Sequence, residues 1–155
     1  MSKEIERKYT VKTTGYRNGA LRKYYKQGYL STDKERTVRV RVTESEGFIT
    51  VKGKNSGIVR DEYEYPIPAS EAHELIENLC FQPVIEKYRY ICPVGDVVWE
   101  IDEFLGENEG LVLAEVELPD EDFPLELPEW VGEEVTGDAR YYNSNLVTHP
   151  YRKWK

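Results

Sequence analysis

Residues 4–9 read Glu-Ile-Glu-Arg-Lys-Tyr, so that both glutamates and the lysine fall on alternate positions, with Ile5 and Tyr9 among the residues between them. Residues two apart in an extended strand share a face. The two glutamates and the lysine therefore lie on one side of such a strand, and Ile5 and Tyr9 lie on the other. The stretch predicts a β-strand over residues 3–12 with one ionic face and one mainly apolar face.

The same alternation recurs along most of the chain. It predicts further strands near residues 22–30, 36–44, 47–54, 59–67, 84–93, 97–104 and 111–118. Short connections rich in glycine and polar residues, such as Ser45-Glu46-Gly47, separate these strands and suit tight turns. The pattern therefore indicates an antiparallel meander of eight strands.

One segment has the periodicity of an α-helix instead. Ser70 is a suitable N-cap for a helix over residues 70–79, whose apolar residues fall on one face. A second, weaker helix is expected over residues 128–135. The predicted fold class is α+β and mainly β, with a few peripheral helices. We expect a single domain over residues 1–155, because a chain of 155 residues is long enough to bury one sizeable core.

Sixteen ionic residues take the same face along these strands. They are eight acids, Glu4, Glu6, Glu62, Glu64, Glu100, Asp102, Glu115 and Glu117, and eight bases, Lys8, Arg39, Arg41, Lys52, Lys54, Arg60, Lys87 and Arg89. An antiparallel sheet often turns its polar face to water, which is one interpretation. Against it, this face has almost no uncharged polar residues, and like charges cluster two residues apart. The alternative is a closed eight-stranded antiparallel β-barrel, a tunnel whose lumen carries the charges.

A charged lumen needs a ligand or water, because each enclosed charge is costly without a partner. Arginine and lysine side chains suit phosphate oxygens, and paired carboxylates suit a hard divalent cation such as Mg²⁺ or Mn²⁺. A polyanion bound together with a metal ion satisfies both sets of charges, and this is the arrangement that phosphoryl transfer needs.

Composition excludes several other classes. The net charge of −8 argues against general nucleic-acid binding, which needs a positive field. No apolar run approaches the ~20 residues of a membrane helix, and the first residues are charged where a secretory signal would be apolar. We therefore expect a cytoplasmic protein that binds neither nucleic acid nor membrane, and no feature implies a protein partner.

The ordered set of ionic residues resembles the CYTH branch of the triphosphate tunnel metalloenzyme family. Residues 4–8 match the family's Glu-x-Glu-x-Lys signature. Its other elements follow in order as Arg39-x-Arg41, Lys52, Glu62-x-Glu64, Lys87-x-Arg89, Glu100-x-Asp102-x-Phe104 and Glu115-x-Glu117. Residues 132–136 and 140–143 also resemble the C-terminal segment of small bacterial members.

The resemblance implies a tunnel that binds a triphosphate along its axis and hydrolyses it with one or two Mg²⁺ or Mn²⁺ ions. It implies metal binding by Glu4, Glu6 and Glu117, with Asp102 and Glu115 near a second metal ion or the attacking water. It implies phosphate binding by Lys8, Arg39, Arg41, Lys52, Arg60, Lys87 and Arg89. Glu62, Glu64 and Glu100 would orient metal ligands or basic groups.

The implied catalytic residues are Glu115, Asp102 and Lys87. Lys87 would stabilise the leaving pyrophosphate oxygen, and Glu115 is one candidate general base, beside a metal-bound hydroxide alone. Tyr29 would either contribute to the tunnel or pack as an ordinary aromatic residue.

Inorganic triphosphate is the favoured substrate because the chain is small and carries no added domain. Alternatives within the family are a nucleoside or thiamine triphosphatase and an adenylate cyclase. A non-catalytic binder of polyphosphate or nucleotide is a further alternative. The Glu-x-Glu pairs on the first and last strands argue against it, since a simple anion trap has no use for acids beside phosphates unless metal ions intervene.

Overall fold

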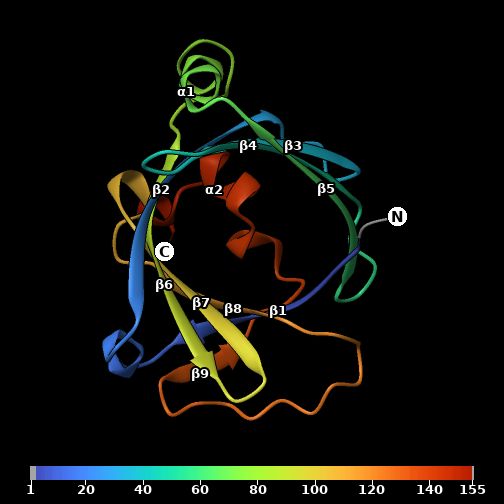
Figure 1. The fold of residues 1–155 in the computed structure, drawn as a ribbon, viewed down its shortest axis with the longest axis vertical. Helices are drawn as coiled ribbons and strands as arrows, with labels where there is room; N and C mark the ends of the chain where they lie inside the picture. The colour runs from blue at the N-terminus through green and yellow to red at the C-terminus, as the bar shows by residue number, and fades with distance from the viewer. Residues whose placement is uncertain (1–2, 155) are drawn as a thin grey trace.

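The computed structural model describes residues 3–154, which form one large antiparallel sheet together with short helices (Figure 1). The strands are β1 (Lys3–Val11), β2 (Leu21–Ser31), β3 (Arg36–Val42), β4 (Gly47–Gly53), β5 (Val59–Ile67), β6 (Ile85–Val94), β7 (Val97–Phe104), β8 (Val112–Glu117) and β9 (Val131–Glu134). The α-helices are α1 (Ala69–Asn78) and α2 (Asn143–Thr148), and the 3-10 turns are η1 (Gly15–Arg17), η2 (Gly106–Asn108), η3 (Ala139–Tyr141) and η4 (Tyr151–Lys153). Neither α-helix of the described residues has the length and apolar composition that a membrane-spanning helix requires.

The sheet closes on itself because β1 forms hydrogen bonds along both edges. The order β5-β4-β3-β2-β6-β7-β8-β1 is completed by pairing of β1 with β5, which makes a ring of these eight strands. Glu4 lies opposite Arg60 across the closing pair, and Lys8 lies opposite Glu115 across the other edge of β1. Residues directly opposite one another point to the same face, so closure brings the ionic faces around one axis. The predicted closed antiparallel fold is confirmed, and the predicted strands and α1 each end within two residues of their expected positions.

Two apolar clusters cover the outside of the ring. Helix α1 places Ala72 and Ile76 against Val40 and Val42 of β3. On the opposite side the buried Trp99 of β7 packs at the centre of a second cluster, with Trp130 edge-on to it at 5.5 Å between ring centroids. The strand residues of these two clusters face outward and are buried there, and the ionic residues at alternate positions face the axis.

The predicted helix over residues 128–135 is wrong, because this segment forms the short strand β9 instead. β9 pairs with Tyr9 and Val11, beyond the part of β1 that pairs with β5. Gly132 lies so close to Thr10 that a side chain would collide with the threonine hydroxyl. The hydrogen bonds that β1 offers at this edge therefore override the weak helical preference of the segment.

A third apolar cluster lies inside the ring, at one end, and includes a helix that the sequence pattern does not predict. Leu146 and Val147 of α2 pack against Ile85, Phe104 and Leu113. These three strand residues share a face with Lys87, Asp102 and Glu115, two positions away from each. The inner face is thus apolar at one end and ionic along the rest. Figure 1 shows α2, in red, within the outline of the ring.

The close approach of β2 to the segment after α1 gives a test of the fold. A Cβ on Gly28 would lie 2.7 Å from the Cβ of Cys80, so Gly28→Ala should lower the free energy of unfolding by about 1–3 kcal/mol through overpacking. Urea denaturation measures this. Gly53→Ala is the matched control, because its Cβ would meet Asp61 at an ordinary 3.5 Å. Equal stability of the two variants would contradict the packing described.

Candidate active site

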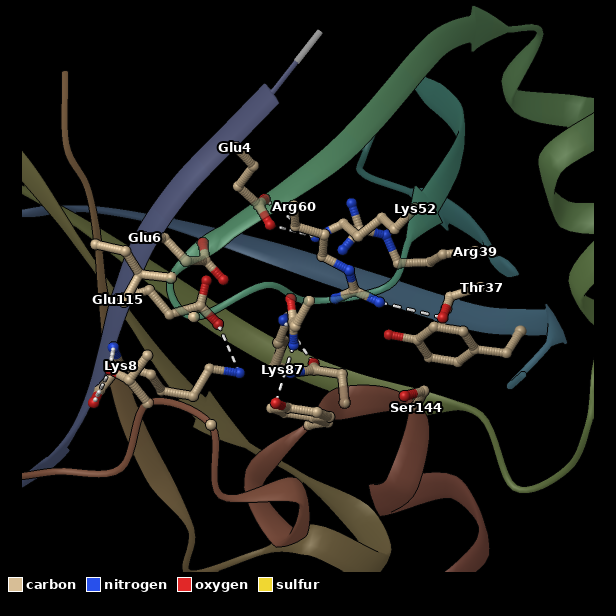
Figure 2. Close-up of a pocket in the computed structure, with 18 of the residues that line it drawn as sticks. Glu4, Glu6, Lys8, Thr37, Arg39, Lys52, Arg60, Lys87, Glu115 and Ser144 are labelled. Carbon is tan, nitrogen blue, oxygen red and sulfur yellow. Dashed lines mark hydrogen bonds and ion pairs between the residues drawn. The ribbon is translucent and has the colours of Figure 1, made fainter. Parts of the chain in front are cut away.

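A polar cavity of about 80 Å³ occupies the interior of the ring beside the inner apolar cluster. One water molecule needs about 10–15 Å³ of cavity space, so there is room for several oxygen atoms of an anion. The lining includes nine of the residues predicted from the sequence: Glu4, Glu6, Lys8, Arg39, Lys52, Arg60, Lys87, Arg89 and Glu115. Figure 2 shows the labelled members of this set converging from the strands of the ring. Six of the nine are bases and three are acids, so the ionic lining carries an excess of positive charge.

Lys52 lies between two carboxylates at one side of the cavity. Its Nζ is 3.1 Å from Glu4 and 3.3 Å from Glu62. Burial alone would raise the pKa of Glu4, but the charge of Lys52 lowers it. Burial and the hydrogen bond with Glu4 raise the pKa of Glu62 to about 7. Glu62 therefore exchanges a proton near neutral pH, next to a carboxylate that stays ionised.

Two of the arginines of β3, Arg39 and Arg41, share one acid. Guanidinium nitrogens of Arg39 and Arg41 each lie 3.6 Å from Glu64, whose carboxylate also accepts a hydrogen bond from Thr50. Burial, together with the charges of Arg39 and Arg89, lowers the pKa of Arg41 to about 10. Within residues 3–154 the buried Nε atoms of Arg39 and Arg41 have no hydrogen-bond partner. Buried donors of this kind favour an anion as the missing acceptor.

Asp102, Lys87 and Arg89 form a buried group in the wall of the ring. Lys87 and Asp102 are each 1% exposed, and their charged atoms are 2.7 Å apart. Arg89 donates to both oxygens of Asp102 through its Nε and one terminal nitrogen. Burial alone would raise the pKa of Asp102, but the charges of Arg89 and Lys87 hold it well below its usual range. Burial lowers the pKa of Lys87 to about 8.

Glu6 of β1 and Glu115 of β8 also line the cavity, and their pKa values shift in opposite directions. Burial raises the pKa of Glu6 well above its usual range, and the charges of Glu115 and Glu4 raise it further. Glu115 differs because Lys8 lies 3.4 Å away, and the charges of Lys8 and Arg89 outweigh burial to lower its pKa to about 2. Figure 2 shows Glu6 and Glu115 pointing toward one another from neighbouring strands.

The remaining predicted residues lie behind or beside the cavity lining. Glu62, Glu64, Glu100 and Asp102 each form an ion pair with a basic residue of the lining. Arg41 pairs with Glu64, and Glu117 lies opposite Glu6 between β8 and β1. In residues 3–154 no three His, Cys, Asp or Glu side chains converge as a metal-binding group. The assignment of Glu4, Glu6, Asp102, Glu115 and Glu117 to metal binding stays a prediction.

The C-terminal segment supplies lining residues that the strand pattern does not reveal. Thr136, Tyr142, Asn143 and Ser144 all line the cavity. The family resemblance of residues 132–136 and 140–143 includes Thr136, Tyr142 and Asn143, and Ser144 lies outside it. The hydroxyl of Tyr142 accepts a hydrogen bond from Asn55 at 2.9 Å. Tyr29 lines the cavity and also packs in the inner apolar cluster, so both interpretations of Tyr29 hold.

Comparison with known proteins gives a consistent result. The profile of the family described as "CYTH domain" matches residues 2–151. The chain is 55% identical to a protein of Acetivibrio thermocellus named inorganic triphosphatase, over 100% of this chain and 99% of that one. It is 37% identical to an inorganic triphosphatase of Nitrosomonas europaea, over 93% of this chain and 96% of that one. A crystal structure described as that of an inorganic triphosphatase has a TM-score of 0.67 and 34% identity, covering 92% and 96% of the two chains.

The buried group around Asp102 predicts a large loss of stability when its carboxylate is removed. Asp102→Ala removes the ion-pair partner of the buried Lys87 and leaves Arg89 with only Glu100, 3.4 Å away, so the free energy of unfolding should fall by about 3–5 kcal/mol in buffer with a chelator. Asp61→Ala is the control, because it removes only an exposed pair with Lys3 and should cost about 1 kcal/mol or less. Unchanged or higher stability of Asp102→Ala would mean that Asp102 mainly repels neighbouring acids.

Proposed function

Because the chain belongs to the CYTH domain family, we propose that it hydrolyses inorganic triphosphate to pyrophosphate and phosphate inside the ring. A water molecule attacks the terminal phosphorus, the bridging P–O bond breaks, and pyrophosphate leaves. The two relatives named inorganic triphosphatase support this substrate, since each matches nearly the whole chain. The structural observation that carries the proposal is the cavity inside the ring, which is lined by six cationic side chains and three carboxylates.

The basic side chains suit the phosphate oxygens of the substrate. Arg39 lines the cavity and forms an ion pair with Glu64. The buried Nε of Arg39 has no acceptor among the described residues. Lys87 has two of its three N–H donors engaged by Asp102 and Asn143, which leaves one for a phosphate oxygen. Held in this way, the bases bind a triphosphate at fixed positions, and such positioning supplies much of the catalysis of phosphoryl transfer.

The acidic side chains fit Mg²⁺ or Mn²⁺. The charges of Glu115 and Glu4 raise the pKa of Glu6, and the charge of Glu115 also acts to raise that of Glu4. A divalent cation bound by these carboxylate oxygens would remove that repulsion. Glu4, Glu6 and Glu115 would hold the ion, with Glu117 beside them. Asp102 fits this role least well, because both of its oxygens already accept hydrogen bonds from Lys87 and Arg89. A bound ion would polarise the terminal phosphoryl group and acidify a water molecule.

Proton and charge movements follow from the same geometry. The low pKa of Glu115 makes it a weak proton acceptor, which favours metal binding or orientation of water over general-base catalysis. Lys87 lines the cavity, and its free N–H donor would stabilise the negative charge that develops on the leaving pyrophosphate. Its lowered pKa of about 8 also makes it able to give up a proton near neutral pH.

A second cavity, of about 210 Å³, adjoins the first and shares Arg60 and Tyr142 with it. Its charged lining residues are Lys34, Lys54 and Arg60, all of them cationic. A field of one sign draws an anion toward a site and speeds its binding. We assign this cavity as the route by which the substrate reaches the ring interior.

A panel of substrates tests the proposed function. Purified protein should release phosphate from tripolyphosphate with Mg²⁺ or Mn²⁺, faster than from pyrophosphate, ATP or thiamine triphosphate, and a chelator should abolish the release. Faster turnover of ATP or thiamine triphosphate would favour the alternative triphosphatases. Tight binding of tripolyphosphate without phosphate release under any metal condition would favour a non-catalytic binder.

A single substitution tests the acidic side of the cavity. Glu6→Gln keeps the shape of the side chain but removes its charge, so kcat with Mg²⁺ should fall by about 100-fold or more as transition-state stabilisation is lost. Steady-state kinetics of phosphate release measures this effect. Glu77→Gln on the exposed face of α1 is the matched control and should be neutral. Full activity of Glu6→Gln would remove Glu6 from the site.

A further inference from the structure

Asn143, the first residue of α2, reaches a buried lysine of the strand ring. The ammonium group of Lys87 donates a hydrogen bond of 3.0 Å to Oδ1 of Asn143 and another of 2.7 Å to Asp102. An ammonium group has three donors, so these two acceptors fix the direction of the third. Asn143 itself lines the cavity, which places this contact at the edge of the candidate active site.

A second amide fixes the orientation of Asn143. The Nε2 group of Gln27, on β2, donates a hydrogen bond of 3.0 Å to the same Oδ1 atom. Because two donors converge on this position, only the oxygen end of the Asn143 amide fits there, and the alternative orientation would place two N–H groups against them. Gln27 therefore holds Asn143 in the orientation that accepts from Lys87.

Burial of the polar side chain of Gln27 lowers the stability of the fold, which suggests that its amide group is kept for its contact with Asn143. The residue is fully buried at 0% exposure, and its Oε1 has no hydrogen-bond partner within residues 3–154. A buried polar atom without a partner destabilises the folded state, because it has lost its hydrogen bonds to water. An apolar residue would avoid this cost, so the position is better explained by what the Nε2 group does for Asn143.

The residues just before Asn143 contact Lys8, another of the three lysines that line the cavity. Nζ of Lys8 donates to the backbone oxygen of Tyr141 at 3.3 Å and lies 5.8 Å from the ring of Tyr142. Three consecutive residues, 141–143, therefore contact Lys8 or Lys87. Leu146 and Val147 hold α2, which follows them directly, in the inner apolar cluster. The segment is well placed to set the geometry of both ammonium groups.

We infer that Asn143, backed by Gln27, is a positioning residue that aims the ammonium group of Lys87 at the substrate. This inference rests on the proposed triphosphate hydrolysis, in which Lys87 meets the leaving pyrophosphate oxygen. Asn143 acts through Lys87 and not on the reacting atoms. Loss of its oxygen frees the ammonium group to turn toward Asp102 alone, so the donor aimed at the substrate is no longer fixed.

The test is phosphate release from tripolyphosphate by the full chain with Mg²⁺. Asn143→Ala should lower kcat by about 10–100-fold, the scale of a small misplacement of a catalytic group, while KM changes by no more than about threefold. Gln27→Leu, which keeps the buried volume but cannot donate, should lower kcat less. Thr148→Ala, on the exposed end of the same helix, is the control and should behave as the unmodified protein. Thermal unfolding of each variant verifies the fold.

Double-mutant cycles separate positioning from a structural role. If Asn143 acts through Lys87, Asn143→Ala should have almost no further effect on kcat in a Lys87→Ala background. Single-turnover experiments with enzyme in excess keep slow variants measurable. If Lys87→Ala shows no turnover at all, the combination of Gln27→Leu with Asn143→Ala supplies the cycle, and its loss should equal that of Asn143→Ala alone.

The inference would be overturned if the fold-losses in kcat of the two single variants multiplied in the double variant. It would also be overturned if Asn143→Ala left kcat unchanged. Neither result would affect the proposed function, provided that the unmodified protein releases phosphate. Absence of phosphate release by the unmodified protein would instead contradict the proposed function itself.

Discussion

The pairing of β1 with β5 is the constraint on which the rest of the structure depends. It involves only the first residues of β1, with Glu4 opposite Arg60, yet it turns a sheet face that water could solvate into the wall of an enclosed space. Charges in such a space cost several kcal/mol each unless they have partners. The dense ion pairing inside the ring follows from this closure, as Lys52 with two glutamates and Asp102 with two cations illustrate.

Closure also gives the interior two distinct ends. Where the inner face is apolar, α2 fills the ring and the packing is that of an ordinary core. Where the inner face is ionic, acids such as Glu64 and Asp102 hold the bases from behind, and the bases present their remaining donors to the cavity. Helix α2 connects the two ends, because Leu146 and Val147 pack in the apolar cluster and Asn143 accepts a hydrogen bond from Lys87 in the ionic part.

Much of this arrangement could be predicted from the sequence, because the face on which a strand residue lies is a local property. Alternation placed the ionic residues on one face, and alternation together with the turn residues between the strands predicted the strand boundaries. Cross-strand register is not local, so the pattern could not show that Asp102 lies opposite Arg89 and is neutralised there, although it shares a face with Glu100. Two short elements, β9 and α2, could not be predicted from the sequence pattern either. β9 exists because β1 has a free edge, and α2 is too short to show a period.

One signal for the missed helix was present. Ile85, Phe104 and Leu113 interrupt the ionic face with apolar residues at one end of three neighbouring strands. An apolar patch inside a closed ring requires an apolar partner, and Leu146 with Val147 is the pair that fills it. The roles of Asn143 and Gln27 depend on that docking, so they became visible only in three dimensions.

The central claim is that a triphosphate and a divalent cation bind together inside the ring. Anomalous diffraction from crystals grown with Mn²⁺ and tripolyphosphate tests it most directly. The account predicts an anomalous peak against the carboxylates of Glu4, Glu6 or Glu115, with phosphate density extending toward Arg39 and Lys87. Manganese and phosphate found only on the outer surface, with the ring interior filled by water, would contradict it.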